Sequence, residues 1–293
     1  MPFTARPSPS APAPERARDP ARRAGLGSML LALALIAAPG LRASAASLDE
    51  IKARGTMIVA TEDSYKPFEY VENGTPMGLD HALLAVLRKD VPFKIEQQII
   101  PWSGLLAGVA AGKYDVALTA AVITPDRIKN LDFTMPIAEA TQYYAVRANE
   151  TRIKGVADLA GRTVGVQAGG ASYAALTDLT QTLAKTGAKL GTVVQYPSFP
   201  EAYQDLVNGR LDYVINGVVN LASLVREQPS RFRMGEAVGA STYAAWAVAK
   251  GNAALLDDLD GFMRKVRADG TLYALQEKWL GTTFKAMPDM PTK

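Results

Sequence analysis

The chain has 293 residues, of which 48% are apolar, so it can bury a large core in one large domain or two moderate ones. It contains no cysteine and a single histidine, His81, which excludes a disulfide framework, thiolate chemistry and a histidine metal cluster. The formal net charge is +3, but the charges are unevenly distributed along the chain.

Residues 1–45 are predicted to be a cleavable secretory signal with a disordered extension before it. An apolar run from Met29 to Ala38 follows Arg16, Arg18, Arg22 and Arg23, and the small residues Ala43, Ser44 and Ala45 suit a cleavage site. The apolar run is shorter than the roughly 20 residues that a membrane helix needs. Residues 2–24 are rich in Pro and Ala, which indicates either a disordered extension or a misplaced start codon.

The leader also carries the basic charge. Residues 1–45 hold six of the 32 basic residues and two of the 29 acidic ones, which leaves 26 basic and 27 acidic residues and a net charge of −1. Nucleic-acid binding needs a basic patch or stripe. The nearly neutral remainder therefore predicts an exported protein that does not bind nucleic acid.

The first unit of the remaining chain alternates strands and helices. A buried strand is predicted at 55–61, where it runs into a loop at 62–68, and a short strand follows at 68–71. A helix begins after Gly78, and we expect His81 near its start to lie on the surface. A strand at 93–100 and a helix that begins at 101–103 complete the alternation.

Residues 115–136 contain the main candidate binding residue. Val116, Leu118, Ala120 and Val122 alternate with their neighbours and predict a short strand, and the pattern breaks at Thr124. Thr124 suits a helix N-cap and Pro125 the first helical position, so a capped helix is expected to carry Arg127 in its first turn. A guanidinium beside free backbone N–H groups could hold a small carboxylate.

A second series of strands and helices begins after a composition change near Arg147. A strand at 143–147 leaves the first unit, and a new buried strand is predicted at 163–167. The turn at 167–172 leads into a helix and resembles an anion-binding turn, although a tight turn without a ligand is an alternative.

The rest of the chain continues this alternation. The pattern predicts strands at 193–196, 209–216 and 243–249, a helix at 199–208, and a helical tail at 255–279 with a break at Asp269-Gly270. The strand at 243–249 could return the chain to the first unit.

From about Leu48 to Gly281 the chain resembles periplasmic solute-binding proteins of family 3, the polar amino-acid class of ABC importers. The motifs that carry the resemblance, in chain order, are Tyr65-Lys66-Pro67-Phe68-Glu69-Tyr70, Gly78-Leu79-Asp80, Trp102-Ser103-Gly104-Leu105-Leu106, Gly112-Lys113-Tyr114-Asp115, Ile123-Thr124-Pro125-Asp126-Arg127, Leu131-Asp132-Phe133, Gly161-Arg162-Thr163-Val164-Gly165-Val166-Gln167, Gly209-Arg210-Leu211-Asp212 and Asp269-Gly270-Thr271-Leu272. The resemblance implies an α/β, two-lobed, type II periplasmic binding protein fold, in which each lobe is a sheet flanked by helices and two crossing strands form the hinge. Its expected parts are the leader at 1–45, the first part of lobe 1 at 46–146, lobe 2 at 147–242, and a return to lobe 1 with the helical tail at 243–293.

The resemblance also implies a ligand site between the lobes. Arg127 would hold the ligand carboxylate, Tyr65 and Trp102 would form apolar walls, and Glu62 would provide an acidic contact. Three structural alternatives stay open: Arg127 could pair only with Asp126 or Asp132, Trp102 could be core, and Glu62 could be a solvated loop charge. The full set of expected ligand-binding residues is Arg127, Trp102, Tyr65, Glu62, Thr124, Ala120, Val122, Gly169, Gly170, Ala171, Ser172, Asn216 and Gly217.

Some of these positions depart from the family pattern. Val122 replaces a usual Ser or Thr, Gly170 and Ala171 replace hydroxyl residues, and Gly217, after Asn216, replaces the aspartate that binds the ligand ammonium. The carboxylate contact is kept, while the ammonium contact is either lost or moved to Glu62. The ligand is then an amino acid, an amino-acid derivative or a non-amino organic acid.

The expected function is that of the extracytoplasmic binding component of an ABC importer, a periplasmic monomer that delivers a small carboxylate or amino-acid ligand to a membrane permease. A lyase or dehydratase that acts on a cyclic carboxylate is the alternative on this fold, and Glu62 is its only convenient acid or base. No cofactor, no metal site and no catalytic residue is expected.

Overall fold

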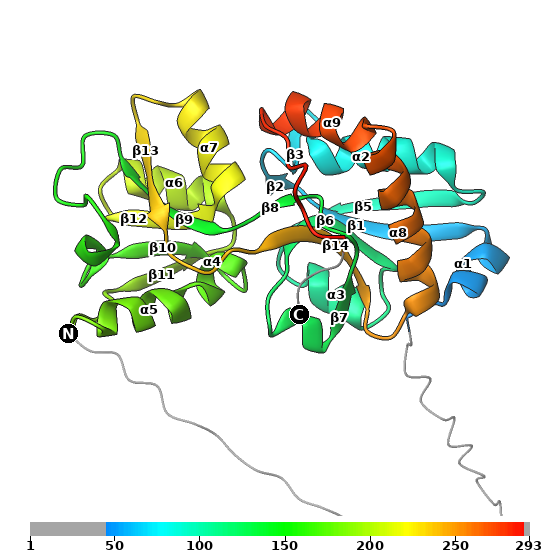
Figure 1. The fold of residues 1–293 in the computed structure, drawn as a ribbon, viewed down its shortest axis with the longest axis horizontal. Coiled ribbons are helices and arrows are strands. Elements are labelled where there is room, and N and C mark those ends of the chain that lie inside the picture. The colour runs from blue at the N-terminus through cyan, green and yellow to red at the C-terminus, as the bar shows by residue number, and fades with distance from the viewer. Residues whose placement is uncertain (1–44, 290–293) are drawn as a thin grey trace, which may run out of the picture. The chain divides into compact units, whose positions relative to one another are not determined.

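The computed structural model describes residues 45–289, and the first of its two large sheets contains mainly the early strands (Figure 1). We call this the first sheet. Its strands, in spatial order, are β5 (Lys94–Ile100), β1 (Thr56–Glu62), β6 (Val116–Val122), β14 (Tyr243–Ala249) and β7 (Leu131–Phe133), with β8 (Ala138–Glu139) beside β14. The strands β5, β1 and β6 are parallel, and β14 is antiparallel to β6.

Helices cover both faces of the first sheet. All seven residues of β6 are buried, as expected for a central parallel strand. Leu118 lies in one core cluster with Leu84 of α2, whereas Ala117 and Ala121 lie in another with Leu105 of α3. The helices of this part are α1 (Leu48–Arg54), α2 (Leu79–Asp90), α3 (Leu105–Ala110), α8 (Ala253–Ala268) and α9 (Thr271–Leu280).

The second sheet repeats this arrangement. Its order is β11 (Val193–Tyr196), β10 (Val164–Gln167), β12 (Tyr213–Gly217), β9 (Gln142–Arg147) and β13 (Phe232–Ala237), and β10 is parallel to both β11 and β12. Its helices are η2 (Val156–Leu159), α4 (Ala171–Ala174), α5 (Leu176–Ala184), α6 (Phe199–Val207) and α7 (Val218–Glu227). A third, small sheet contains β2 (Ser64–Tyr65), β3 (Glu69–Glu72) and β4 (Thr75–Met77).

The chain passes between the two large sheets twice, once between β8 and β9 and once between β13 and β14 (Figure 1). The two passages are hydrogen-bonded to each other. Ala140 N donates to Thr242 O over 2.9 Å, and Val238 N donates to Gln142 O over 2.9 Å. These paired short segments are the only covalent links between the sheets within residues 45–289.

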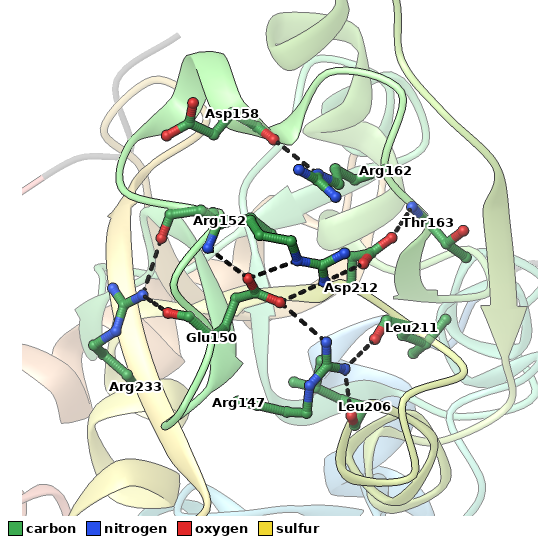
Figure 2. Close-up of polar contacts among 11 residues, drawn as sticks. Arg147, Glu150, Arg152, Asp158, Arg162, Thr163, Leu206, Leu211, Asp212 and Arg233 are labelled. Carbon is green, nitrogen blue, oxygen red and sulfur yellow. Dashed lines mark hydrogen bonds and ion pairs between the residues drawn. The ribbon is translucent and has the colours of Figure 1, made fainter.

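A charged network stabilises the chain just after β9 (Figure 2). Glu150 is buried, and its carboxylate lies 3.1 Å from the guanidinium of Arg147 and 2.5 Å from that of Arg152. Arg152 also pairs with Asp212 at 3.0 Å, just before β12. The hydrogen bonds from Arg152 lower the pKa of Glu150 to about 2, so this carboxylate is charged at neutral pH.

Most of the predicted elements are present, with some differences. The prediction of a capped helix after Thr124 is wrong, because a single 3-10 turn, η1 (Arg127–Lys129), leads directly into β7. The strand expected at 209–216 begins only at Tyr213, because Gly209 has a φ of +77° and residues before 213 form a turn. The strands β13 and β7 and the helix α7 were not predicted.

His81 is also not the surface residue that the sequence suggests. Its ring is buried and lies 2.8 Å from the side-chain amide of Gln97. Burial lowers the pKa of His81 to about 4, so the ring is neutral at pH 7. The physical reason is that the face of α2 that carries His81 packs toward β5.

The predicted leader lies, except for its last residue, outside the described residues. Within residues 45–289 no helix combines the length and the apolar character needed to cross a membrane.

Candidate functional site

The candidate site lies at the carboxyl ends of four parallel strands. Glu62 ends β1, Val122 ends β6, Gln167 ends β10 and Gly217 ends β12. Ligands of open α/β sheets bind beyond the carboxyl ends of the strands, where the strand order changes direction. Both sheets place such an edge at this site.

Arg127 is held by backbone carbonyl groups from both parts of the chain. Its Nη1 donates to Val122 O over 2.7 Å, and its Nη2 donates to Gly169 O over 3.3 Å. Its backbone N–H donates to Thr124 Oγ1 over 3.4 Å, so Thr124 helps to set the turn although no helix follows. The guanidinium carbon lies 4.9 Å from the centre of the Trp102 ring, a cation–π geometry.

The charge of Arg127 has no ion-pair partner within residues 45–289. Burial lowers its pKa to about 10, so the guanidinium is still positive at neutral pH. The alternative pairings with Asp126 and Asp132 are wrong, because Asp126 pairs with Lys129 at 2.6 Å and Asp132 with Lys250 at 2.7 Å. A positive group with donors in a planar fork can accept a carboxylate.

Glu62 is buried, with 1% of its surface exposed, and the alternative of a solvated loop charge is therefore wrong. Its Oε1 accepts a hydrogen bond from Gln167 Nε2 over 3.0 Å. Burial raises the pKa of Glu62 to about 8, and this effect outweighs the opposing hydrogen bond from Gln167 and the charge of Arg127. At pH 7 the carboxyl group is mostly protonated, and a cation placed beside it would favour its ionisation.

Two further buried acids lie behind Glu62. Glu69 accepts a hydrogen bond from Thr119 Oγ1, and Asp80 Oδ1 accepts one from Trp246 Nε1 over 2.6 Å. Burial, with the neighbouring charge of Asp80, raises the pKa of Glu69 well above its ordinary value, and burial also raises the pKa of Asp80. Three buried carboxyl groups, from β1, β3 and α2, therefore lie next to the site.

Aromatic side chains surround the same space. The ring of Tyr65 is buried and lies 6.1 Å from that of Phe199 and 5.6 Å from that of Phe68, measured between centroids. Trp102 is only half-buried, so the alternative that it is core is wrong. Flat rings offer contact area at a small cost in side-chain entropy.

Most of the predicted site residues line one small cavity of about 20 Å³. We call it the cleft cavity. A space of that size holds about one water molecule, so a larger ligand needs more room than the cleft cavity leaves in this arrangement of the chain. Its lining residues are Glu62, Tyr65, Trp102, Ala120, Val122, Arg127, Gln142, Gln167, Ala171, Ser172, Phe199 and Asn216.

Four predicted residues do not line the cleft cavity. Thr124 and Gly169 lie beside Arg127 through the hydrogen bonds given above. Gly170 is the N-cap of α4, and a Cβ there would lie 3.0 Å from Gln167 Cβ. A Cβ at Gly217 would meet Asn220 Oδ1 at 2.7 Å, with Gln142 and Tyr65 next nearest.

Sequence reasoning missed three residues of the cleft cavity, namely Gln142, Gln167 and Phe199. Gln167 could have been identified from the sequence, because it is a polar residue at the end of a buried strand. No sequence feature indicates Gln142 or Phe199 as a residue of the site. Gln142 begins β9, and its Nε2 donates to Ala140 O over 2.8 Å, so only the passage between the sheets places its side chain here.

A family model described as bacterial extracellular solute-binding proteins, family 3, matches residues 57–282. The L-cystine-binding protein TcyJ of Escherichia coli (strain K12) is 30% identical over 264 residues, which cover 89% of this chain and 96% of TcyJ.

Two solved structures are also similar. The ancestral amino acid-binding protein AncCDT-1, a precursor of cyclohexadienyl dehydratase, has a TM-score of 0.70 and 30% identity, over 79% of this chain and 98% of that one. The arginine-, lysine-, histidine-binding protein ArtJ from Geobacillus stearothermophilus has a TM-score of 0.70 and 27% identity, over 78% and 97%. The α/β fold predicted from the sequence, with two sheets flanked by helices, is confirmed.

Proposed function

Because the chain belongs to family 3 of the bacterial extracellular solute-binding proteins, we propose that it captures an amino-acid-like carboxylate for an ABC importer. The observation that carries this proposal is Arg127, a cationic fork at the carboxyl ends of the strands with only backbone carbonyl groups and an aromatic ring around it. A carboxylate would replace the weak 3.3 Å contact with Gly169 by stronger, charge-assisted hydrogen bonds.

The ligand ammonium is proposed to lie near Glu62. Gly217 offers no side chain at the position where relatives have an aspartate, and Glu62 is the acid that lines the cleft cavity. The side-chain amides of Gln142 and Gln167 line the same cavity and could complete the polar contacts. Binding of a cation would draw the proton from Glu62 and create a buried charge pair.

The protein is proposed to act in the periplasm as a monomer, after removal of residues 1–45, and to deliver its ligand to a membrane permease. Two lobes are proposed: lobe 1 consists of residues 46–146 and 243–293, and lobe 2 consists of residues 147–242. The grouping of the strands into a first and a second sheet supports two lobes, and the first passage between them lies between β8 and β9, a few residues before the proposed boundary at 146. The nearly neutral charge of residues 46–293 supports the proposal that nucleic acid is not a partner.

Binding without chemical conversion is the preferred proposal, and the similarity to AncCDT-1, a dehydratase precursor, makes its test necessary. Glu62, with its raised pKa, is the one carboxyl group that lines the cleft cavity. Acid–base catalysis of an elimination usually needs a group that takes a proton and one that assists the leaving group. Incubation with a cyclic carboxylate, followed by NMR, should return the compound unchanged, and a new product would favour the lyase.

Calorimetry on Arg127→Ala tests the proposed function. Loss of a buried partner of a carboxylate costs about 2–5 kcal/mol, so the ligand should bind roughly 30-fold more weakly or worse. Lys129→Ala is the matched control, because Lys129 lies on the same 3-10 turn and pairs only with exposed Asp126. An affinity that is equal in the Arg127→Ala variant and the wild type would contradict the proposal.

The ligand itself can be sought by a thermal-shift screen. L-cystine, L-arginine, the other standard amino acids and simple organic acids are the first probes, because the similar proteins are named for amino acids. A ligand that binds only the folded protein raises its melting temperature with concentration. Stabilisation by amino acids supports the proposal. Stabilisation by organic acids alone would contradict the proposed contact between a ligand ammonium group and Glu62.

A further inference from the structure

A second cavity, of about 240 Å³, lies next to the cleft cavity. We call it the side cavity. Ser64, Tyr65 and Lys66 line it from the first part of the chain, and residues of α6, α7 and the start of β13 line it from the second. Tyr65, Phe199 and Asn216 line both cavities, so the two spaces share a wall.

The wall of the side cavity is a connected series of aromatic rings. The ring centroids of Tyr65 and Phe199 are 6.1 Å apart, those of Phe199 and Tyr203 are 5.9 Å apart, and those of Tyr203 and Phe232 are 5.9 Å apart. Such spacings are those of rings in mutual contact, so the rings form a continuous apolar wall against which a further ring could pack. An apolar cavity of roughly 150 Å³ accommodates benzene, so the side cavity is large enough for a ring.

Neutral polar groups lie on the same wall. Asn216 Nδ2 donates to the hydroxyl of Tyr203 over 2.8 Å, and Asn220 Nδ2 donates to Lys66 O over 2.9 Å. The charges of Lys66 and Glu227 neutralise each other in an ion pair of 3.0 Å, and both side chains are about 40% exposed (42% and 39%). The third charged residue of the lining, Arg231, is exposed, and its Nη1 donates to Gln228 Oε1 over 2.8 Å. The buried part of this cavity therefore suits an uncharged group better than an ion.

Gly217 lies between the two cavities. A Cβ at this position would lie 2.7 Å from Asn220 Oδ1 in the side cavity, 3.7 Å from Gln142 Nε2 in the cleft cavity, and 3.8 Å from the hydroxyl of Tyr65, which lines both. The backbone of Gly217 has φ −58° and ψ 145°, which other residues also adopt. A glycine is thus required here because the neighbouring side chains leave no room for a Cβ, and not because of the backbone conformation.

We propose that the side cavity binds the distal end of the ligand, and that this end is an uncharged ring. The carboxylate lies at Arg127, the middle of the ligand passes the residues that the two cavities share, and the ring packs against the wall formed by Phe199 and Tyr203. This inference rests on the proposed function for the carboxylate end only. It identifies the ligand class as carboxylates that carry an aromatic or similarly flat group.

Matched pairs of probes test the inference by calorimetry. The pairs are L-phenylalanine with L-alanine, and phenylacetate, 3-phenylpropionate and 4-phenylbutyrate with acetate, propionate and butyrate. Within each pair only the phenyl group differs. We expect the best ring-bearing probe to bind at least roughly tenfold more tightly than its partner, because burial of a phenyl group contributes at least that much.

Two variants locate the ring. Tyr203→Leu and Phe232→Leu each remove one ring from the wall of the side cavity, and neither residue lines the cleft cavity. Each variant should reduce the preference for the ring severalfold while the affinity for the short probes changes little. Tyr273→Leu on α9 and Phe284→Leu are the matched controls, since neither residue lines either cavity. If Tyr203→Leu does not fold, Phe232→Leu alone decides the test.

Three results would overturn the inference: equal affinities within every pair, failure of all probes to bind, or an unchanged ring preference in both folded variants. Arg127→Ala separates this inference from the proposed function. If that variant still prefers ring-bearing probes and binds them as tightly as the wild type, the carboxylate site fails while the ring site stands. If Arg127→Ala weakens the binding of every probe by the same factor, the carboxylate site and the ring site both stand.

Discussion

Gln167, the last residue of β10, donates its side-chain amide to Glu62, the last residue of β1, over 3.0 Å. This hydrogen bond joins the second sheet to the first, and both side chains are buried. The acid that it fixes is mostly protonated at neutral pH, because burial raises the pKa of Glu62 to about 8. This contact bears on the proposed ligand binding, on the pH dependence of stability and on the predicted movement of the sheets.

Glu62→Gln should separate amino-acid ligands from other carboxylates. An ammonium group buried against Glu62 would lose its counter-charge in this variant, at a cost of several kcal/mol, so binding of an amino acid should be nearly abolished. A ligand without an amine should bind as before or slightly more tightly, because a nearby acid is removed. Calorimetry with both ligand types checks this, with exposed Glu72→Gln as control, and undiminished binding of an amino acid would exclude Glu62 from the ammonium site.

The same carboxyl group should make folding stability fall as the pH rises. Folded Glu62 keeps its proton up to about pH 8, whereas its ordinary pKa is 4.5, so the unfolded chain releases the proton first. Between these pH values the free energy of unfolding should decrease by up to about 1.4 kcal/mol per pH unit, and the loss should end near pH 8.

Urea denaturation of the wild type and of Glu62→Gln between pH 5 and 8 measures this effect. Glu69 and Asp80 act in the same direction, because their pKa values are also raised, so only the difference between the two proteins reports on Glu62. Parallel stability curves for the two proteins would show that Glu62 is ionised in the folded state.

The two sheets are predicted to separate and close around the ligand. The cleft cavity of about 20 Å³ is too small for an amino acid, and within the described chain the sheets are linked covalently only by the two passages. A ligand that contacts both sheets favours the closed arrangement, because only there are all contacts made. Small-angle scattering should show a smaller radius of gyration with saturating ligand, and identical curves would argue against this movement.

Glu150→Gln should destabilise the protein without a direct effect on the ligand site. The variant leaves Arg147 and Arg152 close together without their shared carboxylate, and we expect a loss of about 1–3 kcal/mol in the free energy of unfolding. Asp126→Asn, which removes an exposed ion pair with Lys129, is the control and should barely change the melting temperature. Equal melting temperatures for wild type and Glu150→Gln would contradict a stabilising role.

The pH dependence of Glu150 has the opposite sign to that of Glu62. Its pKa is lowered from 4.5 to about 2 in the folded protein, so its contribution is present above pH 4.5 and is lost as the pH falls toward 2. Acid denaturation of the Glu150→Gln variant should therefore show a weaker pH dependence between 4.5 and 2 than that of the wild type.

Local sequence patterns determined most of the strands and helices. The strands at Val193–Tyr196 and Tyr243–Ala249 have the predicted bounds, and the helix break at Asp269-Gly270 falls between α8 and α9. Apolar periodicity and glycine breaks act within a few residues, so they are visible without the fold. The order of the motifs was also sufficient to indicate the family. It further indicated Arg127 and Trp102 as candidate ligand-binding residues.

Local patterns failed where distant contacts decide the outcome. Thr124 and Pro125 suit a helix start, but the chain turns at once into β7, which pairs with β14 more than 100 residues later. His81 follows Asp80 near a helix start, where the sequence suggested the surface, and is nevertheless buried against Gln97. Pairing and burial of this kind depend on residues far along the chain, which a short window of sequence does not contain.

The burial and the charge state of the site residues were likewise decided by the tertiary structure. The sequence by itself determined that an acid at position 62 follows a buried strand and that position 217 is a glycine, where the resemblance to the family implies an aspartate. Only the packing of the two sheets buries Glu62 beside Gln167, raises its pKa, and places Gly217 between the cleft cavity and the side cavity. The physical reason is that desolvation and free space are properties of the whole packed chain, whereas propensity and motif order belong to short segments of it.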